Sequence, residues 1–209
     1  MKTPHASYRI DRWSLSPKRK RAAPPLVLLL YAHYEGFCKF AFALYASAVN
    51  RSGISCGEAT YAIAAASLTD LFRNLRNPQK KCDLFRRELP DDSNLHQFAR
   101  EREFVERTSE VDLRPVYIPD HVVDTESNLT PVVLKKNLFR LGLPHDQFQV
   151  HDNEINKLLG VRNGISHGSL KEGVEEKLYE QLRAAAFAIM SGLGAGIMKA
   201  LLDKAYVRN

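Results

Sequence analysis

Cysteine is scarce in this sequence, and the few present form no recognisable binding or cross-linking pattern. Cys38, Cys56 and Cys82 are odd in number, none belongs to a C-x-x-C pair, and no pair of histidines is placed to complete a zinc site. We therefore expect neither a disulfide framework nor a structural metal, and no cofactor. Reduced thiols in a cytoplasmic protein fit this pattern best.

The first apolar run of the chain is short. The apolar run at 26–32 follows the basic Lys18-Arg19-Lys20-Arg21, the order found in a signal peptide, but no small-residue cleavage site comes after it. The run is far shorter than the roughly 20 residues that span a bilayer, and His33, Glu35 and Lys39 follow directly. The sequence predicts neither secretion nor insertion into a membrane.

The sequence does contain enough apolar material for one folded domain. Hydrophobic residues make up 44% of the chain and charged residues 26%, close to globular averages. Residues 1–21 are polar and basic without periodicity and are predicted to form a flexible arm, which leaves 22–209 as a single domain. A net charge of +6 favours polyanionic partners such as nucleic acid, although many basic proteins have no such partner.

Helix signals account for most of the chain. Pro24 and Pro25 open a helix that runs to about Asn50, and its apolar residues lie on nearly every face. Such a helix is buried centrally, or is buried on one side and used in an interface on the other. Caps, prolines and apolar spacing predict further helices at 55–77 (Ser55 with Glu58 as a capping box), 94–107, 131–141 (Thr130 cap, Gly142 stop), from Asp152 as a cap to 168, and from the Ser169 and Glu172 box to about Val207.

Residues 109–130 break this pattern, because Pro115 and Pro119 bracket a short apolar stretch. They are predicted to form a long connection with room for a short hairpin. The sum is an all-α bundle of five to six helices with one irregular insertion at about 109–130.

The segment 153–168 carries the candidate chemistry. At about 100° per residue, Arg162 falls in the middle of an apolar face, and a buried guanidinium must find an anion because an unpaired buried charge is costly. Asn163 and His167 lie side by side at i and i+4 on the next stripe. A third stripe, where another backbone or a ligand can come close, consists of Gly160, Gly164 and Gly168.

Two structural alternatives stay open for these residues. Arg162 could form an ion pair inside the core, and His167 could be a cation at a helix C-terminus, where the helix dipole favours positive charge. Neither alternative requires a ligand.

The same residues carry a family resemblance. The run Arg162-Asn163-Gly164-Ile165-Ser166-His167 resembles the R-N-x-x-x-H signature of the HEPN superfamily, with Ser166 in place of the more frequent alanine. Residues 30–37, and residues 125–129 followed by 141–143, resemble the first-helix and middle blocks of its MAE-type branch. The three blocks occur in the right order and cover about residues 26–205.

The resemblance implies an HEPN-like helical bundle that dimerises through its two motif helices. It also implies a metal-independent ribonuclease used as a toxin or in defence against phage, with an antitoxin or another regulatory protein as a partner. The catalytic pair is then Arg162 and His167, Asn163 is a polar helper, and Glu35 is the acidic residue of the first helix. Glu35 is expected to hold Arg162 or His167 in place, or else to pair with Lys39 on its own helix.

Further residues are expected to contact RNA. Those beside the motif are Ser166, Gly164 and Gly168. Those at the end of the second helix and just after it are Arg73, Arg76 and Lys80, although a solvated helix end also explains this basic cluster.

The chemistry of the two residue types supports this assignment. RNA cleavage without a metal needs a base for the ribose 2′-hydroxyl, an acid for the leaving 5′ oxygen and positive charge for the phosphorane, and histidine and arginine supply these properties. Arg162 and His167 are five positions apart, so they point about 140° apart on a regular helix. We expect a two-fold dimer to bring Arg162 of one subunit to His167 of the other.

An endoribonuclease is therefore the leading hypothesis. Its rivals are a non-catalytic helical module that binds RNA, a nucleotide or a protein in the same groove, and a structural dimerisation domain in which Arg162 is only a core ion pair. The presence of both Arg162 and His167 favours the enzyme, because binding alone has no need of a base with a neutral pKa.

Overall fold

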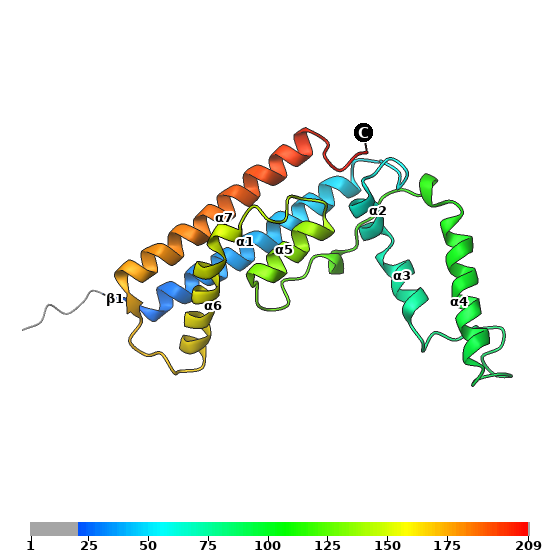
Figure 1. The fold of residues 1–209 in the computed structure, drawn as a ribbon, viewed down its shortest axis with the longest axis horizontal. Coiled ribbons are helices and arrows are strands. Elements are labelled where there is room, and N and C mark those ends of the chain that lie inside the picture. The colour runs from blue at the N-terminus through cyan, green and yellow to red at the C-terminus, as the bar shows by residue number, and fades with distance from the viewer. Residues whose placement is uncertain (1–20, 209) are drawn as a thin grey trace, which may run out of the picture.

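Two long helices form the body of the protein, and the computed structural model describes residues 21–208. α1 (Pro24–Asn50) and α7 (Glu176–Leu202) each contain 27 residues, and they lie side by side and run in the same direction (Figure 1). The predicted bounds of the first helix are confirmed, with proline in its first turn. The last helix ends five residues before the predicted Val207.

A short ribbon joins the starting ends of these two helices. β1 (Arg21–Ala22) pairs antiparallel with β2 (Val174–Glu175). Gly173 precedes β2 with φ +73°, and an ideal Cβ at this position would lie 2.0 Å from the Ala22 carbonyl oxygen, so only glycine fits. Arg21, which the sequence analysis placed in the flexible N-terminal segment, therefore belongs to the folded part. The other residues of that segment, 1–20, lie outside the described residues.

Two shorter helices complete the body. α6 (Asp152–Ser166) contacts both long helices, and α5 (Pro131–Arg140) packs against α6. The predicted start and stop of α5 are confirmed, because the Thr130 hydroxyl accepts a bond from the Val133 N–H at 3.2 Å and Gly142 follows with φ +68°. Side chains less than 2% exposed fill the space between the helices, among them Tyr34, Phe42, Tyr45, Ile155, Leu158, Leu182 and Ile189.

Three helices form an arm that extends from the body at the end opposite α6 (Figure 1). They are α2 (Tyr61–Ser67), α3 (Thr69–Arg76) and α4 (Ser93–Thr108), and "the arm" means these three helices and the segments that join them. α2 leads into α3, and α3 packs against α4 with the Phe72 and Phe104 ring centroids 5.8 Å apart. α4 confirms the helix predicted at 94–107. The helix predicted at 55–77 is interrupted at Leu68 and begins later than expected.

The capping box at Ser55 and Glu58 explains the late start. The Ser55 N–H donates to the Glu58 carboxylate at 2.7 Å, and the Glu58 N–H donates to the Ser55 hydroxyl at 3.4 Å. The reciprocal bonds of a capping box are thus present. The segment nevertheless stays a turn, because Ser55 and Ala59 form bridges with Pro115 and Val207 instead of continuing into a helix.

The connection at 109–130 contains two short 3₁₀ turns, η1 (Val111–Leu113) and η2 (Asp120–Val122). No hairpin forms in it, since the only strands among residues 21–208 are β1 and β2. The sequence allowed for a hairpin because it could not show that this connection pairs with a distant segment, as Pro115 does with Ser55.

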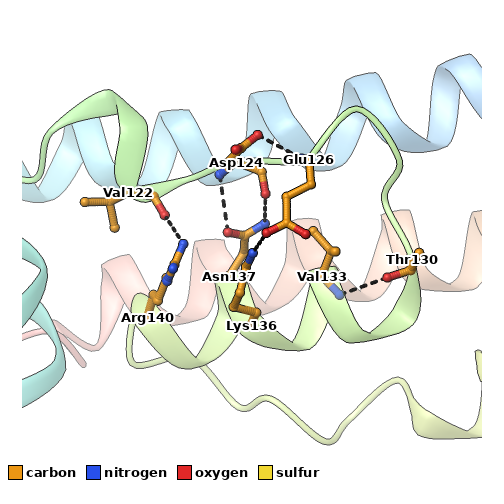
Figure 2. A network of polar contacts seen from close by, with 8 residues as sticks. All are labelled: Val122, Asp124, Glu126, Thr130, Val133, Lys136, Asn137 and Arg140. Carbon is orange, nitrogen blue, oxygen red and sulfur yellow. Dashed lines mark hydrogen bonds and ion pairs between the residues drawn. The ribbon is translucent and has the colours of Figure 1, made fainter.

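Side chains of α5 hold the end of this connection in place (Figure 2). The fully buried Asn137 amide donates to the Asp124 carbonyl at 2.9 Å and accepts from the Asp124 N–H. Lys136 forms an ion pair with Glu126, and Arg140 donates to the Val122 carbonyl at 3.2 Å. These contacts satisfy backbone groups that an irregular segment would otherwise leave unpaired.

Two further predictions need correction. The described residues contain seven α-helices instead of five or six, because the helix expected at 55–77 is two helices. The box expected at Ser169 and Glu172 does not start α7, since the Ser169 hydroxyl donates back to the Gly164 carbonyl at 3.0 Å and β2 intervenes. The all-α class itself is confirmed.

Both long helices are apolar along much of their length. By length and composition alone, α1 and α7 would each be able to cross a membrane. They pack against each other and against α6, and the core helix of a soluble protein has the same composition.

Candidate active site

α6 presents two faces of different chemistry. Ile155, Leu158 and Leu159 are buried toward the body. The opposite face is exposed and carries Asn153, Asn156, Lys157 and Gly160, followed by the exposed Ser166, His167 and Gly168 at the helix end. An exposed polar face of this kind is free to meet a ligand or a second protein.

The first turn of α6 differs from the prediction that Asp152 is its cap. Asp152 is the first helical residue, and His151 holds the cap position without a side-chain hydrogen bond. Asp152 and Glu154 both lie in the first turn, where the positive end of the helix dipole favours carboxylates.

Arg162 does not form the core ion pair that was one of its two interpretations. Its side chain is half-buried, and among residues 21–208 no carboxylate oxygen lies within 4.0 Å of it. Its Cζ lies 4.8 Å from the centroid of the Tyr31 ring, and its Nη1 donates to the Asn163 side-chain oxygen at 2.9 Å. The remaining guanidinium N–H groups have no acceptor within the described residues, so they stay available to an anion.

Tyr31 anchors this arrangement from α1. Its ring is only 3% exposed, and its hydroxyl accepts a bond from the Leu129 N–H at 2.9 Å and donates to the Asn128 side-chain oxygen at 3.2 Å. Burial raises the pKa of the phenol, the Glu35 carboxylate raises it further, and the Arg162 guanidinium opposes the shift. The two opposite charges therefore both lie close to Tyr31, which stays a neutral phenol.

Glu35 follows Tyr31 by one turn of α1. One of its carboxylate oxygens, Oε1, is buried and has no hydrogen-bond partner among the described residues. Neither predicted ion pair forms within that part of the chain, whether with Arg162 or His167 or with Lys39. The Glu35 carboxylate nevertheless interacts with the Tyr31 hydroxyl, since both its charge and a side-chain hydrogen bond raise the pKa of Tyr31.

His167 lies one residue beyond the last residue of α6. Its backbone N–H donates to the Asn163 carbonyl at 2.9 Å, and its side chain is exposed. Helical geometry separates the directions of Arg162 and His167 by about 140°. One chain therefore offers a half-buried guanidinium and an exposed imidazole on different sides of the same helix end.

Comparison with known families decides to which family this site belongs. A family model described as HEPN_MAE_28990/-like HEPN matches residues 13–206, which is nearly the whole chain. The chain belongs to the HEPN superfamily, in its MAE-type branch. Neither the curated proteins nor the solved structures give a match. The resemblance seen in the sequence is confirmed at the level of the family.

The residues of the HEPN motif that were expected to contact RNA lie together at the end of α6. Ser166 and Gly168 are exposed, and Gly168 adopts φ +74° in the turn that follows the helix. Gly164 is less open, since an ideal Cβ there would lie 3.4 Å from the Ser169 hydroxyl and from the Leu170 side chain. The turn after the helix thus covers part of the expected glycine stripe.

The basic residues expected to extend the RNA site lie elsewhere. Arg73, Arg76 and Lys80 belong to the arm, at the end of the molecule opposite α6 (Figure 1). Arg73 pairs with Asp70 at 2.5 Å, Lys80 pairs with Glu103, and the Arg76 Cζ lies 5.8 Å from the centre of the Phe72 ring. The structure does not bring them together with the HEPN motif.

No residue of the motif lines the cavity between α2 and α5, and none belongs to a possible metal site within the described residues. A cavity of about 520 Å³ lies between α2 and α5, lined by residues such as Tyr61, Ala65 and Phe139 and by no residue of the motif. Within the described part of the chain, no group of three or more histidine, cysteine, aspartate or glutamate side chains is placed to hold a metal ion.

The sequence analysis missed Tyr31 and Asn128 as members of this site. A signal for Tyr31 was present, because it precedes Glu35 by four positions and therefore lies on the same side of its helix. Asn128 belongs to the 125–129 block that resembles the family, but nothing in the sequence indicated its contact with Tyr31, which joins positions separated by 97 residues.

Proposed function

We propose that this HEPN protein is an endoribonuclease that cleaves RNA through attack of a ribose 2′-hydroxyl, with Arg162 and His167 as catalytic residues. One observation carries the proposal: Arg162 is half-buried, has no carboxylate within 4.0 Å among the described residues, and keeps free N–H donors. A guanidinium kept in this way is suited to a phosphate, which it can hold through two parallel hydrogen bonds.

The reaction needs a base, an acid and a cation. The His167 imidazole takes the proton of the 2′-hydroxyl, the 2′ oxygen bonds to phosphorus, and the bond from phosphorus to the 5′ oxygen breaks. The leaving oxygen takes a proton from water or from a protonated imidazole. Arg162 neutralises the charge that develops on the phosphorane, and Asn163 fixes the guanidinium through its side-chain oxygen.

A second copy of the chain completes the site in this proposal. Positions five apart on a regular helix point about 140° apart, and His167 directly follows the end of α6, so we expect that one copy does not readily place both groups on one phosphate. A two-fold axis beside α6 would supply the guanidinium from one copy and the imidazole from the other.

Attraction of RNA depends largely on the N-terminal residues. Residues 1–20 contain six lysines or arginines and one aspartate, so they carry five of the six net positive charges. The rest of the chain is nearly neutral. We infer that the basic Lys18-Arg19-Lys20 run adds to phosphate binding by long-range attraction, whereas Arg73, Arg76 and Lys80 make at most a separate contact from the arm.

Membership of the HEPN superfamily supports a proposal for the biological role. We propose that the enzyme acts in the cytoplasm as a toxin or phage-defence effector, and that an antitoxin or another regulatory protein restrains it. The RNA target is single-stranded or loop RNA, because its 2′-hydroxyl and backbone can adopt the geometry needed for attack.

Incubation of the purified protein and its His167→Ala variant with total RNA in EDTA tests the proposal. We expect the parent alone to cleave and to leave 2′,3′-cyclic phosphate ends. Cleavage of DNA, which lacks the attacking hydroxyl, or equal cleavage by the variant, would contradict the proposed chemistry. A matched variant, His145→Ala on the surface away from the motif, should keep full activity.

A non-catalytic binding module is the second candidate. It is favoured by the 140° separation in a single chain, which suits two independent contacts to a ligand better than one reacting phosphate. The same assay distinguishes it, since a module would bind RNA equally with and without His167 and would cleave with neither.

A further inference from the structure

Tyr31 lies between the HEPN motif and a loop that is distant in sequence. On one side its ring lies under the Arg162 guanidinium, with 4.8 Å between the Cζ and the ring centroid. On the other side its hydroxyl holds Asn128 and Leu129 through two hydrogen bonds. No other described residue makes both kinds of contact with this site.

The loop at 124–130 is an unusual partner, because its backbone is held in an unfavourable conformation. Glu126 and Ser127 both have positive φ values, 53° and 58°, which cost energy for residues other than glycine. The Asp124 and Asn137 contacts hold one end of the loop and the Thr130 cap holds the other (Figure 2). Tyr31 is the contact that ties the middle of this loop to α1.

The Arg162 side chain needs such a support. A long side chain on a helix end samples many rotamers in water, and ordering it costs free energy that binding must offset. Stacking on a buried aromatic ring restricts the guanidinium while leaving its in-plane N–H groups free. The hydrogen bond to Asn163 fixes its rotation further.

We propose that Tyr31 is a positioning residue, whose ring orients Arg162 for phosphate and whose hydroxyl makes that orientation depend on the 124–130 loop. The catalytic part of this inference rests on the proposed nuclease function, whereas the structural part does not. Tyr31 itself touches no substrate in this proposal. Any partner that moves the loop would therefore change the orientation of Arg162.

The structural part is tested by NMR on ¹⁵N-labelled full-length protein. An aromatic ring shifts the resonances of protons that lie over it, so the Arg162 Hε signal should move far in Tyr31→Leu. Tyr31→Phe keeps the ring but loses both loop contacts, so it should only broaden or slightly shift the signal. Asn128→Ala should broaden or shift the same signal while the ring is intact, since the loop contact is lost. Unchanged Arg162 signals in Tyr31→Leu would overturn the proposal whether or not the protein cleaves RNA.

The catalytic part is tested by steady-state cleavage with the same variants. We expect kcat/KM to fall about tenfold in Tyr31→Leu, the size of effect expected from loss of a cation–π contact, with kcat taking most of the loss. Tyr31→Phe should recover most of it. Equal losses in the Phe and Leu variants would contradict the role of the ring.

Tyr45→Leu serves as the matched control for folding. Tyr45 is another buried tyrosine of α1, 1% exposed and 14 residues further along the helix. Its loss should lower the melting temperature to a similar extent but leave kcat and the Arg162 signals unchanged. If Tyr45→Leu reduced kcat as strongly as Tyr31→Leu, the effect of Tyr31 would be general destabilisation and the proposal would be wrong.

Discussion

Phe40 and Tyr31 lie on opposite sides of α1. They are nine residues apart, which corresponds to about half a turn around the helix. Tyr31 is 3% exposed and faces α6, whereas Phe40 is 63% exposed. The exposed apolar residues on the Phe40 side, Leu26, Leu29, Phe37, Phe40 and Leu44, therefore lie away from the motif. α1 is buried on one side and open on the other, which is one of the two arrangements that its composition allowed.

Two modes of dimerisation can be told apart by the surface that they use, either α6 or the Phe40 side of α1. A dimer through α6 brings the two motifs together, whereas a dimer through the Phe40 side keeps them apart. Gly160→Gln places a side chain on the open face of α6, where an added Cβ meets nothing within 4 Å. We expect this variant to fold normally, to lose dimer in light scattering, and to cleave RNA at least about tenfold more slowly.

Phe40→Gln is the control for that experiment. It removes an exposed aromatic ring on the far side of α1 and should leave both the dimer and the cleavage rate unchanged. Loss of dimer in Phe40→Gln with a normal dimer in Gly160→Gln would contradict the proposed arrangement of the motifs.

Replacement of Arg162 should separate charge from geometry. Arg162→Ala removes the cation and should lower kcat by about 10²- to 10³-fold, as expected for loss of one preorganised donor to a charged transition state. Arg162→Lys keeps the charge but not the planar fork and should recover only part of the rate. Because no carboxylate pairs with Arg162 in the described structure, both variants should melt near the parent temperature. A large drop in melting temperature would instead indicate a core ion pair.

Glu35→Gln should have opposite effects on stability and activity. The amide introduces donors and removes a charge at a buried oxygen that lacks a partner, so the free energy of unfolding should stay constant or rise by about 1 kcal/mol. RNA cleavage should fall if the Glu35 charge, which acts on Tyr31, helps to hold Arg162 in place. Chemical denaturation and cleavage assays on the same sample measure both quantities, and a stabilised variant with full activity would remove Glu35 from the site.

The basic N-terminal run should determine the salt dependence of RNA binding. Lys18, Arg19 and Lys20 replaced together by glutamine should weaken binding and reduce the slope of log affinity against log salt by up to about 2, given about 0.7 per phosphate contact on single strands. The matched variant is Arg73→Gln, whose charge is already paired with Asp70. If Arg73→Gln changes the slope more than the triple variant does, the helices α2–α4 carry the phosphate contacts and the N-terminal run does not.

Glu103 should make the stability of the arm depend on pH. A hydrogen bond from Lys80 holds the pKa of Glu103 below its ordinary value of 4.5, with the charges of Lys80 and Arg107 adding to this effect and burial opposing it. A carboxyl whose pKa is lower in the folded state stabilises the fold above about pH 5, and this contribution is lost as the pH falls through 4.5 toward the lowered value. The parent should therefore be more stable than Glu103→Gln at pH 7, by about 1 kcal/mol or less, and this difference should shrink as the pH falls below 4.5.

Hydrogen exchange of α3 and α4 across this pH range measures that difference. Arg102→Gln is the control, because the pair of Arg102 with Glu106 is largely exposed and exposed pairs contribute little. A difference that persists unchanged at pH 3 would show that Glu103 acts through packing and not through its charge.

Local signals in the sequence predicted most helices correctly, and the reason is physical. The proline pair at 24–25 and the Thr130 cap act within one or two turns of chain, so their effects do not depend on the rest of the fold. The boxes at Ser55 and Ser169 failed for the opposite reason. Ser55 pairs with the distant Pro115, and the Ser169 hydroxyl donates back to the Gly164 carbonyl. These contacts took the place of the expected helix starts.

The sequence alone determined the all-α class, the helices α1 and α5, and the family. Periodicity, caps and a short motif are properties of neighbouring residues. Only the tertiary structure decided what surrounds Arg162. Its ring partner Tyr31 comes from α1, and the support for Tyr31 comes from Asn128 and Leu129, which are separated from it by 97 and 98 residues. Contacts over such separations form when helices pack, and packing depends on the whole core and not on any local pattern.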